Sequence, residues 1–348
     1  MTTDIIDQPV RLRSPADIVE AVPHLVGFQP EDSLVIIALR GKRGRLGVVA
    51  RLDLAEIWQK PRRVALVLDF LQRDSASRAL LVFYPPSGGR AHPAIAPTVD
   101  ALTQHLEPAG ISIDDVLCVC EGRWWSLRCD APACCPPEGT PVDSSGASAM
   151  AMAAVVKGRA TLGSRRELER TIEPLGGAVG AAMAYALPRA RAELDDRVAA
   201  GESDTIAKES ISLLTQAVEA RLAADRSSAA MLTVDCAARL IVGLADVRVR
   251  DELLCWSEGE HGAATCALLV ELAQHAAPPF GEAPLTVLAW IAYLRGEGAL
   301  AGIAVDRMLA GGDVNGLVRI LDQALRSGFN PSRFGAALRA LRRPSSGG

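Results

Sequence analysis

Residues 129–146, with the sequence CDAPACCPPEGTPVDSSG, divide the chain into two parts of different pattern. Four prolines lie between Pro132 and Pro141, and proline has no amide hydrogen to give to a central strand, so this stretch is expected to be a loop. Before the loop, short β-rich runs alternate with helical ones, whereas after it apolar residues follow a helical period. The pattern predicts three segments: an α/β domain over 1–143, an all-α domain over 144–342 and a disordered tail over 343–348.

The part before the loop has the pattern of a mixed sheet with helices packed against it. SLVIIALR (33–40) is a continuous apolar run, typical of a buried strand, and the following GKRG predicts a hairpin into RLGVVARLDL (45–54). In this second strand Arg51 and Asp53 lie on one face. The other face is apolar at period two, with Leu46, Val48, Ala50, Leu52 and Leu54. Further strands (RALLVFY, VLCVC, WWSLR) and two helices complete a predicted β-β-α-β-α-β-β order.

The part after the loop predicts about ten helices separated by glycine and other breakers. The last segments, 283–312 and 314–330, have the spacing of successive helix pairs, which is similar to the stacking of tetratricopeptide-type proteins. The predicted helices cover residues 148–158, 163–173, 178–200, 203–224, 227–245, 248–257, 260–276, 284–295, 298–310, 314–327 and 331–342.

Composition excludes several classes of protein. The chain has 348 residues, 49% hydrophobic and 22% charged, which excludes a collagen and a wholly disordered chain. The net charge is −4, and residues 1–143 carry 15 basic against 18 acidic side chains, so a polybasic nucleic-acid coat protein is excluded. The eight cysteines are too sparse for a disulfide scaffold. We see no secretory signal and no apolar run long enough to span a membrane, and we expect a cytoplasmic protein.

Three cysteines in the proline-rich loop, Cys129, Cys134 and Cys135, are the candidate metal ligands. Zinc prefers four soft ligands, usually with a C-x2-4-C knuckle, and this spacing differs from that knuckle. A fourth ligand would come from elsewhere, for instance His92 or His105. A zinc site, a redox disulfide pair and simple loop packing therefore stay open as alternatives, and no other cofactor is expected.

Two further groups are candidate ligand-binding residues. PPSGGRAHP follows a strand and precedes a helix, the place where α/β sheets bind ligands, so the amides of Gly88 and Gly89 with the charge of Arg90 could hold an anion. A flexible turn is the alternative, because no phosphate-binding glycine motif is present. Arg51 and Asp53 could form a polar pair on the sheet, either as part of an active site or as a surface ion pair.

Several segments together are distinctive, and they resemble the actinobacterial domain of unknown function 4192. They are SPADIVEAVPHLVGFQPEDSLVIIALRG (14–41), LGVVARLDL (46–54), GRWWSLRCDAPACCPPEGTPV (122–142) and LAWIAYLRGEGALAGIAVDRMLAG (288–311). The resemblance extends over most of the chain. It implies a cytoplasmic protein of actinobacterial origin and supplies no activity.

These observations favour a non-catalytic adaptor or regulatory module that binds an unidentified protein partner through its helical part. The first alternative is an enzyme of unrecognised type that binds a small anionic ligand at the sheet edge, using Arg51 and Asp53 near the glycine loop. The second is a nucleic-acid accessory protein that uses the basic hairpin around Lys42, which the acidic balance of the domain disfavours.

Overall fold

The computed structural model describes residues 12–59, 63–86, 89–143, 161–223, 232–312, 314–331 and 334. These residues form two compact units. The first contains the described residues up to Arg165 together with Ala324–Asn330, and the second contains Arg166–Gln323 with Pro331 and Phe334. The predicted helix at 148–158, most of that at 331–342 and the predicted tail at 343–348 lie outside the described residues.

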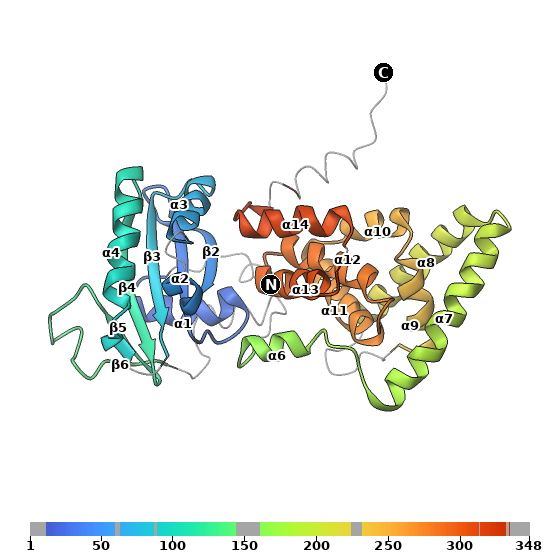
Figure 1. Cartoon of the computed structure of the whole chain (residues 1–348), viewed down its shortest axis with the longest axis horizontal. Coiled ribbons are helices and arrows are strands. Elements are labelled where there is room, and N and C mark those ends of the chain that lie inside the picture. The colour runs from blue at the N-terminus through green and yellow to red at the C-terminus, as the bar shows by residue number, and fades with distance from the viewer. Residues whose placement is uncertain are drawn as a thin grey trace, which may run out of the picture. The chain divides into compact units, whose positions relative to one another are not determined.

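The first unit is built on a mixed sheet, as the sequence predicts (Figure 1). Its six described strands have the order β2-β1-β3-β4-β5-β6. The pairing of β3 with β4 is parallel and all other neighbours are antiparallel. The strands are β1 (Ser33–Arg40), β2 (Arg45–Asp53), β3 (Arg78–Tyr84), β4 (Ser112–Cys120), β5 (Arg123–Ser126) and β6 (Thr140–Pro141).

Helices cover both faces of this sheet, which explains why the sequence of β1 is a continuous run of apolar residues. One face packs against α2 (Leu54–Gln59), α3 (Arg63–Arg73) and α4 (Ile95–Leu106), while the other packs against α1 (Pro15–Val26). Alternate residues of β1 therefore enter two separate cores: Leu34, Ile36 and Ala38 in the first, and Val35 and Ile37 in the second.

The edge strand β2 departs from the predicted alternation at one point. Ile37 pairs with Val49 but Leu39 pairs with Leu46, so two residues of β2 oppose Ala38 alone. Such a β-bulge reverses the side-chain alternation beyond it. Leu46 consequently shares the face of Leu39, which packs on the α1 side, and it is 42% exposed. The predicted placement of Leu46 on the same face as Val48 is therefore wrong, and the extra residue is the reason.

A buried carboxylate stabilises this bulge. The side chain of Asp74, which follows α3, is fully buried, and its Oδ2 accepts hydrogen bonds from Arg40 Nε at 2.8 Å and from the Val48 amide at 3.0 Å. The hydrogen bond from Arg40 to Asp74, together with the negative charge of that carboxylate, raises the pKa of Arg40 above its ordinary value. A Cβ on Gly47 would lie 2.1 Å from Asp74 Oδ2, so glycine at the bulge is what lets the carboxylate approach the strand.

The second unit is helical, as predicted. Its most buried element is α12 (Glu282–Leu294), in which every residue from Pro284 to Tyr293 is buried. Among the described helices, none combines the length and the apolar character needed to cross a lipid bilayer. The remaining helices are α6 (Arg165–Arg170), α7 (Gly177–Ala199), α8 (Ser203–Ala223), α9 (Val234–Gly243), α10 (Val247–Leu254), α11 (Gly259–His275), α13 (Gly298–Ala310) and α14 (Gly316–Arg326).

Candidate functional site

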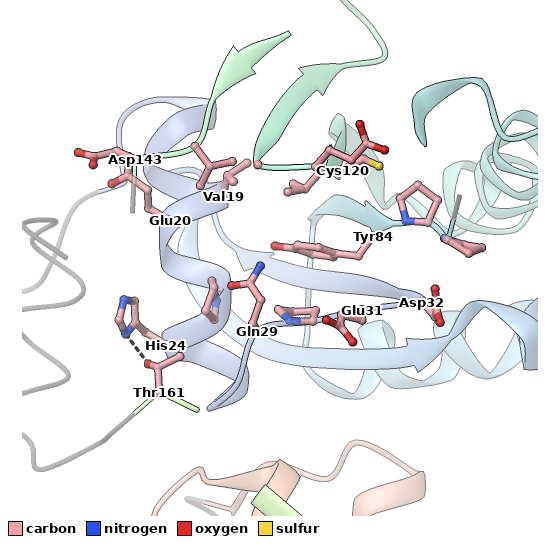
Figure 2. A pocket seen from close by; sticks show the side chains of 18 residues that line it. Val19, Glu20, His24, Gln29, Glu31, Asp32, Tyr84, Cys120, Asp143 and Thr161 are labelled. Carbon is pink, nitrogen blue, oxygen red and sulfur yellow. Dashed lines mark hydrogen bonds between the residues drawn. The ribbon is translucent and has the colours of Figure 1, made fainter. Parts of the chain in front are cut away.

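A cavity of about 890 Å³ opens in the first unit at the carboxyl ends of the parallel strands β3 and β4. Open α/β sheets commonly bind ligands at this end of their parallel strands. Its lining comes from one face of α1, the turn before β1, the segment after β3, the β4–β5 turn and two later segments (Figure 2). Phe28 forms a parallel bridge with Leu162, which brings Thr161 to the cavity although it follows the proline-rich loop.

The cavity is strongly acidic. Its described lining contains no lysine and no arginine, and His24 is its one imidazole. Carboxylates come from five positions: Glu20, Glu31, Asp32, Glu121 and Asp143. Within the described part of the chain, no ion pair involves Glu20, Glu31, Asp32 or Glu121. These four carboxylates are therefore not neutralised by a basic side chain of the described residues.

The two titratable groups that α1 contributes have shifted pKa values. Burial, followed by the nearby carboxylates of Asp143 and Asp17, raises the pKa of Glu20 above its ordinary 4.5. Burial lowers the pKa of His24 below its ordinary 6.5. The His24 ring also forms a 2.7 Å hydrogen bond between its Nδ1 and Thr161 Oγ1. At neutral pH the lowered pKa of His24 favours a neutral imidazole in a cavity whose lining contains five carboxylates.

Tyr84, the last residue of β3, contributes an unusual polar group to the cavity. The residue is only 4% exposed, and its hydroxyl has no hydrogen-bond partner among the described residues. Burial raises the pKa of the phenol. Figure 2 shows the hydroxyl directed toward the helix that carries Glu20 and His24. Since a buried polar group without a partner costs about 1–3 kcal/mol, a ligand that reached this hydroxyl and bonded to it would remove that cost.

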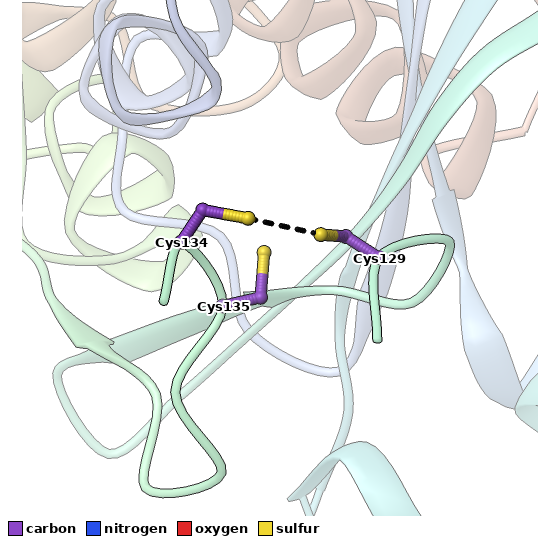
Figure 3. Close-up of side chains that lie close together, drawn as sticks. All are labelled: Cys129, Cys134 and Cys135. Carbon is purple, nitrogen blue, oxygen red and sulfur yellow. Dashed lines mark hydrogen bonds between the residues drawn. The ribbon is translucent and has the colours of Figure 1, made fainter. Parts of the chain in front are cut away.

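The three candidate cysteines form a second cluster. All three Sγ atoms lie within 4.8 Å of one another, and Cys129 Sγ is 3.2 Å from Cys134 Sγ. Figure 3 shows the Cys129 and Cys134 sulfurs facing each other with that of Cys135 pointing between them. The amide of Ala131 and the thiols of Cys134 and Cys135 lower the pKa of Cys129. Burial and the neighbouring thiols raise the pKa of Cys135 to about 11.

The histidines considered as a fourth metal ligand lie elsewhere. His92 stacks on Trp58 with ring centroids 4.4 Å apart, and His105 Nδ1 is 2.8 Å from the carbonyl oxygen of Ala101. Among the described residues, the group that could hold a metal ion contains the three cysteines and no histidine. The suggestion that His92 or His105 completes the set is therefore wrong.

The predicted anion-binding group is only partly described, since Gly88 lies outside the described residues. Gly89 begins the short 3-10 helix η1 (Gly89–Ala91) at a positive φ of 52° and packs against Cys120. The Arg90 guanidinium lies 5.8 Å from the centre of the Trp125 ring. Neither Gly89 nor Arg90 belongs to the cavity lining, although Pro85 and Pro86 of the same segment do.

Arg51 and Asp53 form the polar pair that the strand pattern predicts. Arg51 Nη2 lies 2.8 Å from Asp53 Oδ1 and also donates to the Glu31 carbonyl at 3.3 Å. The pair stands on the edge strand, with β1 and β3 between it and β4. The fold therefore does not bring Arg51 and Asp53 together with Gly89 and Arg90 in one site.

Sequence reasoning missed the acidic cavity. Glu20, Tyr84, Glu121 and Asp143 lie in four separate segments, and no motif connects them. The one signal that was available is the position of the PPSGGRAHP segment after a strand, since its first two prolines do reach the cavity. The sequence pattern therefore placed this segment at the end of the sheet where the cavity lies, but it predicted a site for an anion, whereas the cavity lining is acidic.

These features define a two-unit protein in which a mixed α/β unit carries both an acidic cavity and a thiol cluster and a helical unit follows. The chain belongs to the family described as "Domain of unknown function (DUF4192)", whose model matches residues 15–332. This membership confirms the resemblance seen in the sequence. Comparison with curated proteins gave no match, and comparison with solved structures gave none.

Proposed function

We propose that the α/β unit binds a small organic cation, a ligand with amine or guanidinium groups, in the acidic cavity. The observation that carries this proposal is the buried Tyr84 hydroxyl, which has no partner among the described residues and is directed toward α1 in the wall of a cavity whose lining includes five carboxylates. A protonated amine can donate hydrogen bonds to the phenol oxygen and to carboxylates such as Glu20. Hydrogen bonds with a charged partner are the stronger kind, about 1.5–3 kcal/mol each.

An organic cation suits the cavity better than a metal ion does. Calcium and magnesium need several oxygen ligands around one point, yet no three carboxylates of the described cavity approach one another as closely as the cysteines do. Dispersed carboxylates can instead contact an elongated ligand with more than one charged group. The volume of about 890 Å³ lies within the usual range for small-molecule sites.

The other roles considered for the chain stay predictions. Binding of a protein partner would concern the helical unit, and binding of an anion would concern the Gly89–Arg90 segment rather than the cavity. An enzymatic role and nucleic-acid binding have no described feature that favours them over ligand binding. We further propose an actinobacterial, cytoplasmic protein, supported by the composition and by eight cysteines that form no disulfide bond in the described structure.

Isothermal titration of the full chain with agmatine and spermidine tests the proposal. The wild type is expected to bind at least one of these cations and to bind neither a neutral polyol nor a nucleotide. Tyr84→Phe is expected to weaken cation binding about 10-fold or more, since one hydrogen bond to a charged group is lost. The same change is expected to raise the free energy of unfolding by about 1 kcal/mol, because it removes an unpaired buried hydroxyl.

Tyr185→Phe is the matched control, because Tyr185 lies in the helical unit and is 75% exposed. This variant should change neither cation affinity nor stability. Equal affinity of the wild type for cations and for neutral polyols would contradict the proposal. So would a Tyr84→Phe variant that binds the cations as tightly as the wild type.

Cation affinity is also expected to fall as the pH is lowered from about 7 toward 4.5. The pKa of Glu20 is raised above 4.5 and that of His24 is lowered below 6.5. On acidification Glu20 therefore loses its negative charge early, and His24 becomes positive only below its ordinary range. Both changes oppose a bound cation. Titrations at several pH values test this, and Glu20→Gln should flatten the dependence.

An affinity that stays constant over this window would contradict the assignment of Glu20 to the binding site. The pH dependence of the free energy of unfolding provides an independent check on the directions of the Glu20 and His24 pKa shifts. The lowered His24 pKa gives stability that is present above pH 6.5 and is lost as the pH falls through the folded-state value. The raised Glu20 pKa acts in the opposite sense, with stability lost as the pH rises from 4.5.

A further inference from the structure

The loop between β5 and β6 contains the second cluster of reactive side chains, outside the lining of the acidic cavity. We propose that Cys129, Cys134 and Cys135 bind a single thiophilic metal ion, Zn²⁺, through three sulfur ligands, with the fourth position open to solvent. The proposal is independent of the cation site, because none of the three cysteines lines that cavity.

The positions of the sulfur atoms fit a tetrahedral zinc ion. Zinc–sulfur bonds of about 2.3 Å in a tetrahedron place sulfur atoms about 3.8 Å apart. The Cys129 and Cys134 sulfurs lie 3.2 Å apart, and all three sulfurs lie within 4.8 Å of one another, so the spacing is close to that value. Small side-chain rotations are therefore enough to bring all three sulfurs to bonding distance of one ion.

The backbone explains how adjacent cysteines can serve the same ion. The amides of Cys134 and Cys135 both donate to the carbonyl oxygen of Ala131, at 3.1 and 2.8 Å. This turn folds the chain back toward Cys129, whose sulfur approaches the pair from the other side (Figure 3).

Contacts on both sides of the cluster hold the loop in this form. Before it, Arg128 donates to the carbonyl of Ile113 on β4. After it, the Trp125 indole donates to the Pro137 carbonyl at 3.1 Å, and a Cβ on Gly139 would lie 2.4 Å from the Trp125 ring. Because the loop is already anchored, little conformational entropy is lost when a metal ion binds.

A metal ion accounts for the cluster better than a disulfide does. A disulfide between Cys129 and Cys134 would leave Cys135 without a role and would require an external oxidant. Three thiolates around one point match the ligand preference of a soft ion such as Zn²⁺. Cys134 is exposed, so the remaining coordination position faces water, as in zinc sites that keep one exchangeable ligand.

Titration with Zn²⁺ alone, in competition with a chromophoric chelator, tests the proposal on the reduced and chelator-stripped full chain. We expect the wild type to take up one equivalent. We expect the variants Cys129→Ser, Cys134→Ser and Cys135→Ser to lose this uptake. Cys255→Ser is the matched control, since Cys255 is a half-buried cysteine of the helical unit, and it should bind as the wild type does.

Thiol protection gives a second readout that does not depend on the folding of any variant. In the wild type, Zn²⁺ should protect Cys129, Cys134 and Cys135 from alkylation and leave Cys255 unprotected, as mass spectrometry of the peptides would reveal. Failure of the reduced wild type to take up zinc would overturn the proposal. Uptake that persists in all three serine variants would do the same, as would a Cys129–Cys134 disulfide in a protein that binds no metal when reduced.

Discussion

Replacement of Arg40, whose side chain is 36% exposed, by methionine is expected to lower the free energy of unfolding by about 2–3 kcal/mol, because solvent screens part of the lost interaction. The side chain of Asp74 is fully buried, and Arg40 supplies the charge that compensates it. Methionine keeps most of the aliphatic stem but leaves the carboxylate with the Val48 amide as its one remaining donor among the described residues. Urea denaturation of the full chain measures this loss of stability in the unfolding transition of the α/β unit.

A second substitution separates the charge effect from lost packing. Arg40→Met combined with Asp74→Asn removes the uncompensated charge and keeps an acceptor for Val48, so the double variant should be more stable than Arg40→Met alone. Arg43→Met, at an exposed position of the same hairpin, should change stability by no more than about 0.5 kcal/mol. A double variant that is less stable than the single one would show that the buried charge does not determine the loss.

The elements that the sequence predicts well are those with a local pattern. The apolar run of β1 predicts a strand buried on both faces, and both cores indeed contain its residues. The helices after the proline-rich loop follow from apolar periodicity and glycine spacing, and α13 has the predicted bounds. Such patterns can be recognised in the sequence because the burial of each residue follows the periodicity of the helix or strand that contains it.

The bulge in β2 was not predictable in the same way. It depends on Asp74, which is 26 residues away from Val48 along the chain, and on the absence of a side chain at Gly47. Gly47 lies within RLGVVARLDL, where a glycine signals a bulge only weakly. α1 offers a similar case. A proline inside a helical pattern usually ends or kinks the helix, but α1 continues through Pro23 to Val26. This continuation places His24 at the cavity.

The two candidate sites differ in how far the sequence could indicate them. The cysteines lie within seven consecutive positions, so their proximity follows from the loop alone and the sequence identified them. The cavity residues come from α1, from the ends of β3 and β4 and from Thr161, and only the tertiary fold brings them together. Nothing in the sequence indicates that the Tyr84 hydroxyl lacks a described partner, since a tyrosine at the end of a strand is usually interpreted as a core residue.

The two candidate sites lie near opposite ends of the short strand β5, the cavity near the β4–β5 turn and the cysteine loop where β5 ends beside Val116 and Ile113. The turn of β4 into β5 contributes Glu121 to the cavity, and β5 leads directly into the cysteine loop. Trp124 packs in the core beneath α1, whereas Trp125 on the opposite face contacts the loop after the cysteines. One short strand therefore connects both sites, and its two tryptophans support the packing on its two faces.

The helical unit is expected to lose about 3–5 kcal/mol of stability when Trp290 is replaced by alanine. Trp290 lies on α12 and is 5% exposed. Its ring makes edge contacts with Tyr293 and Phe334, at centroid distances of 6.1 and 5.4 Å. Because α12 is buried on every side, neighbouring helices cannot fill the cavity without moving. Circular dichroism at 222 nm under increasing urea, dominated by the helical unit, measures the effect.

Trp256→Ala provides the matched control for this large-to-small change. Trp256 lies in the same unit but is half-buried, and its indole donates to Glu252 at 3.2 Å, so its removal should cost clearly less than that of Trp290. If the Trp290→Ala variant unfolded at the same urea concentration as Trp256→Ala, α12 would not be the centre of the helical core. A shift confined to the helical transition, with the α/β transition unchanged, would instead show that the second unit is stabilised by its own core.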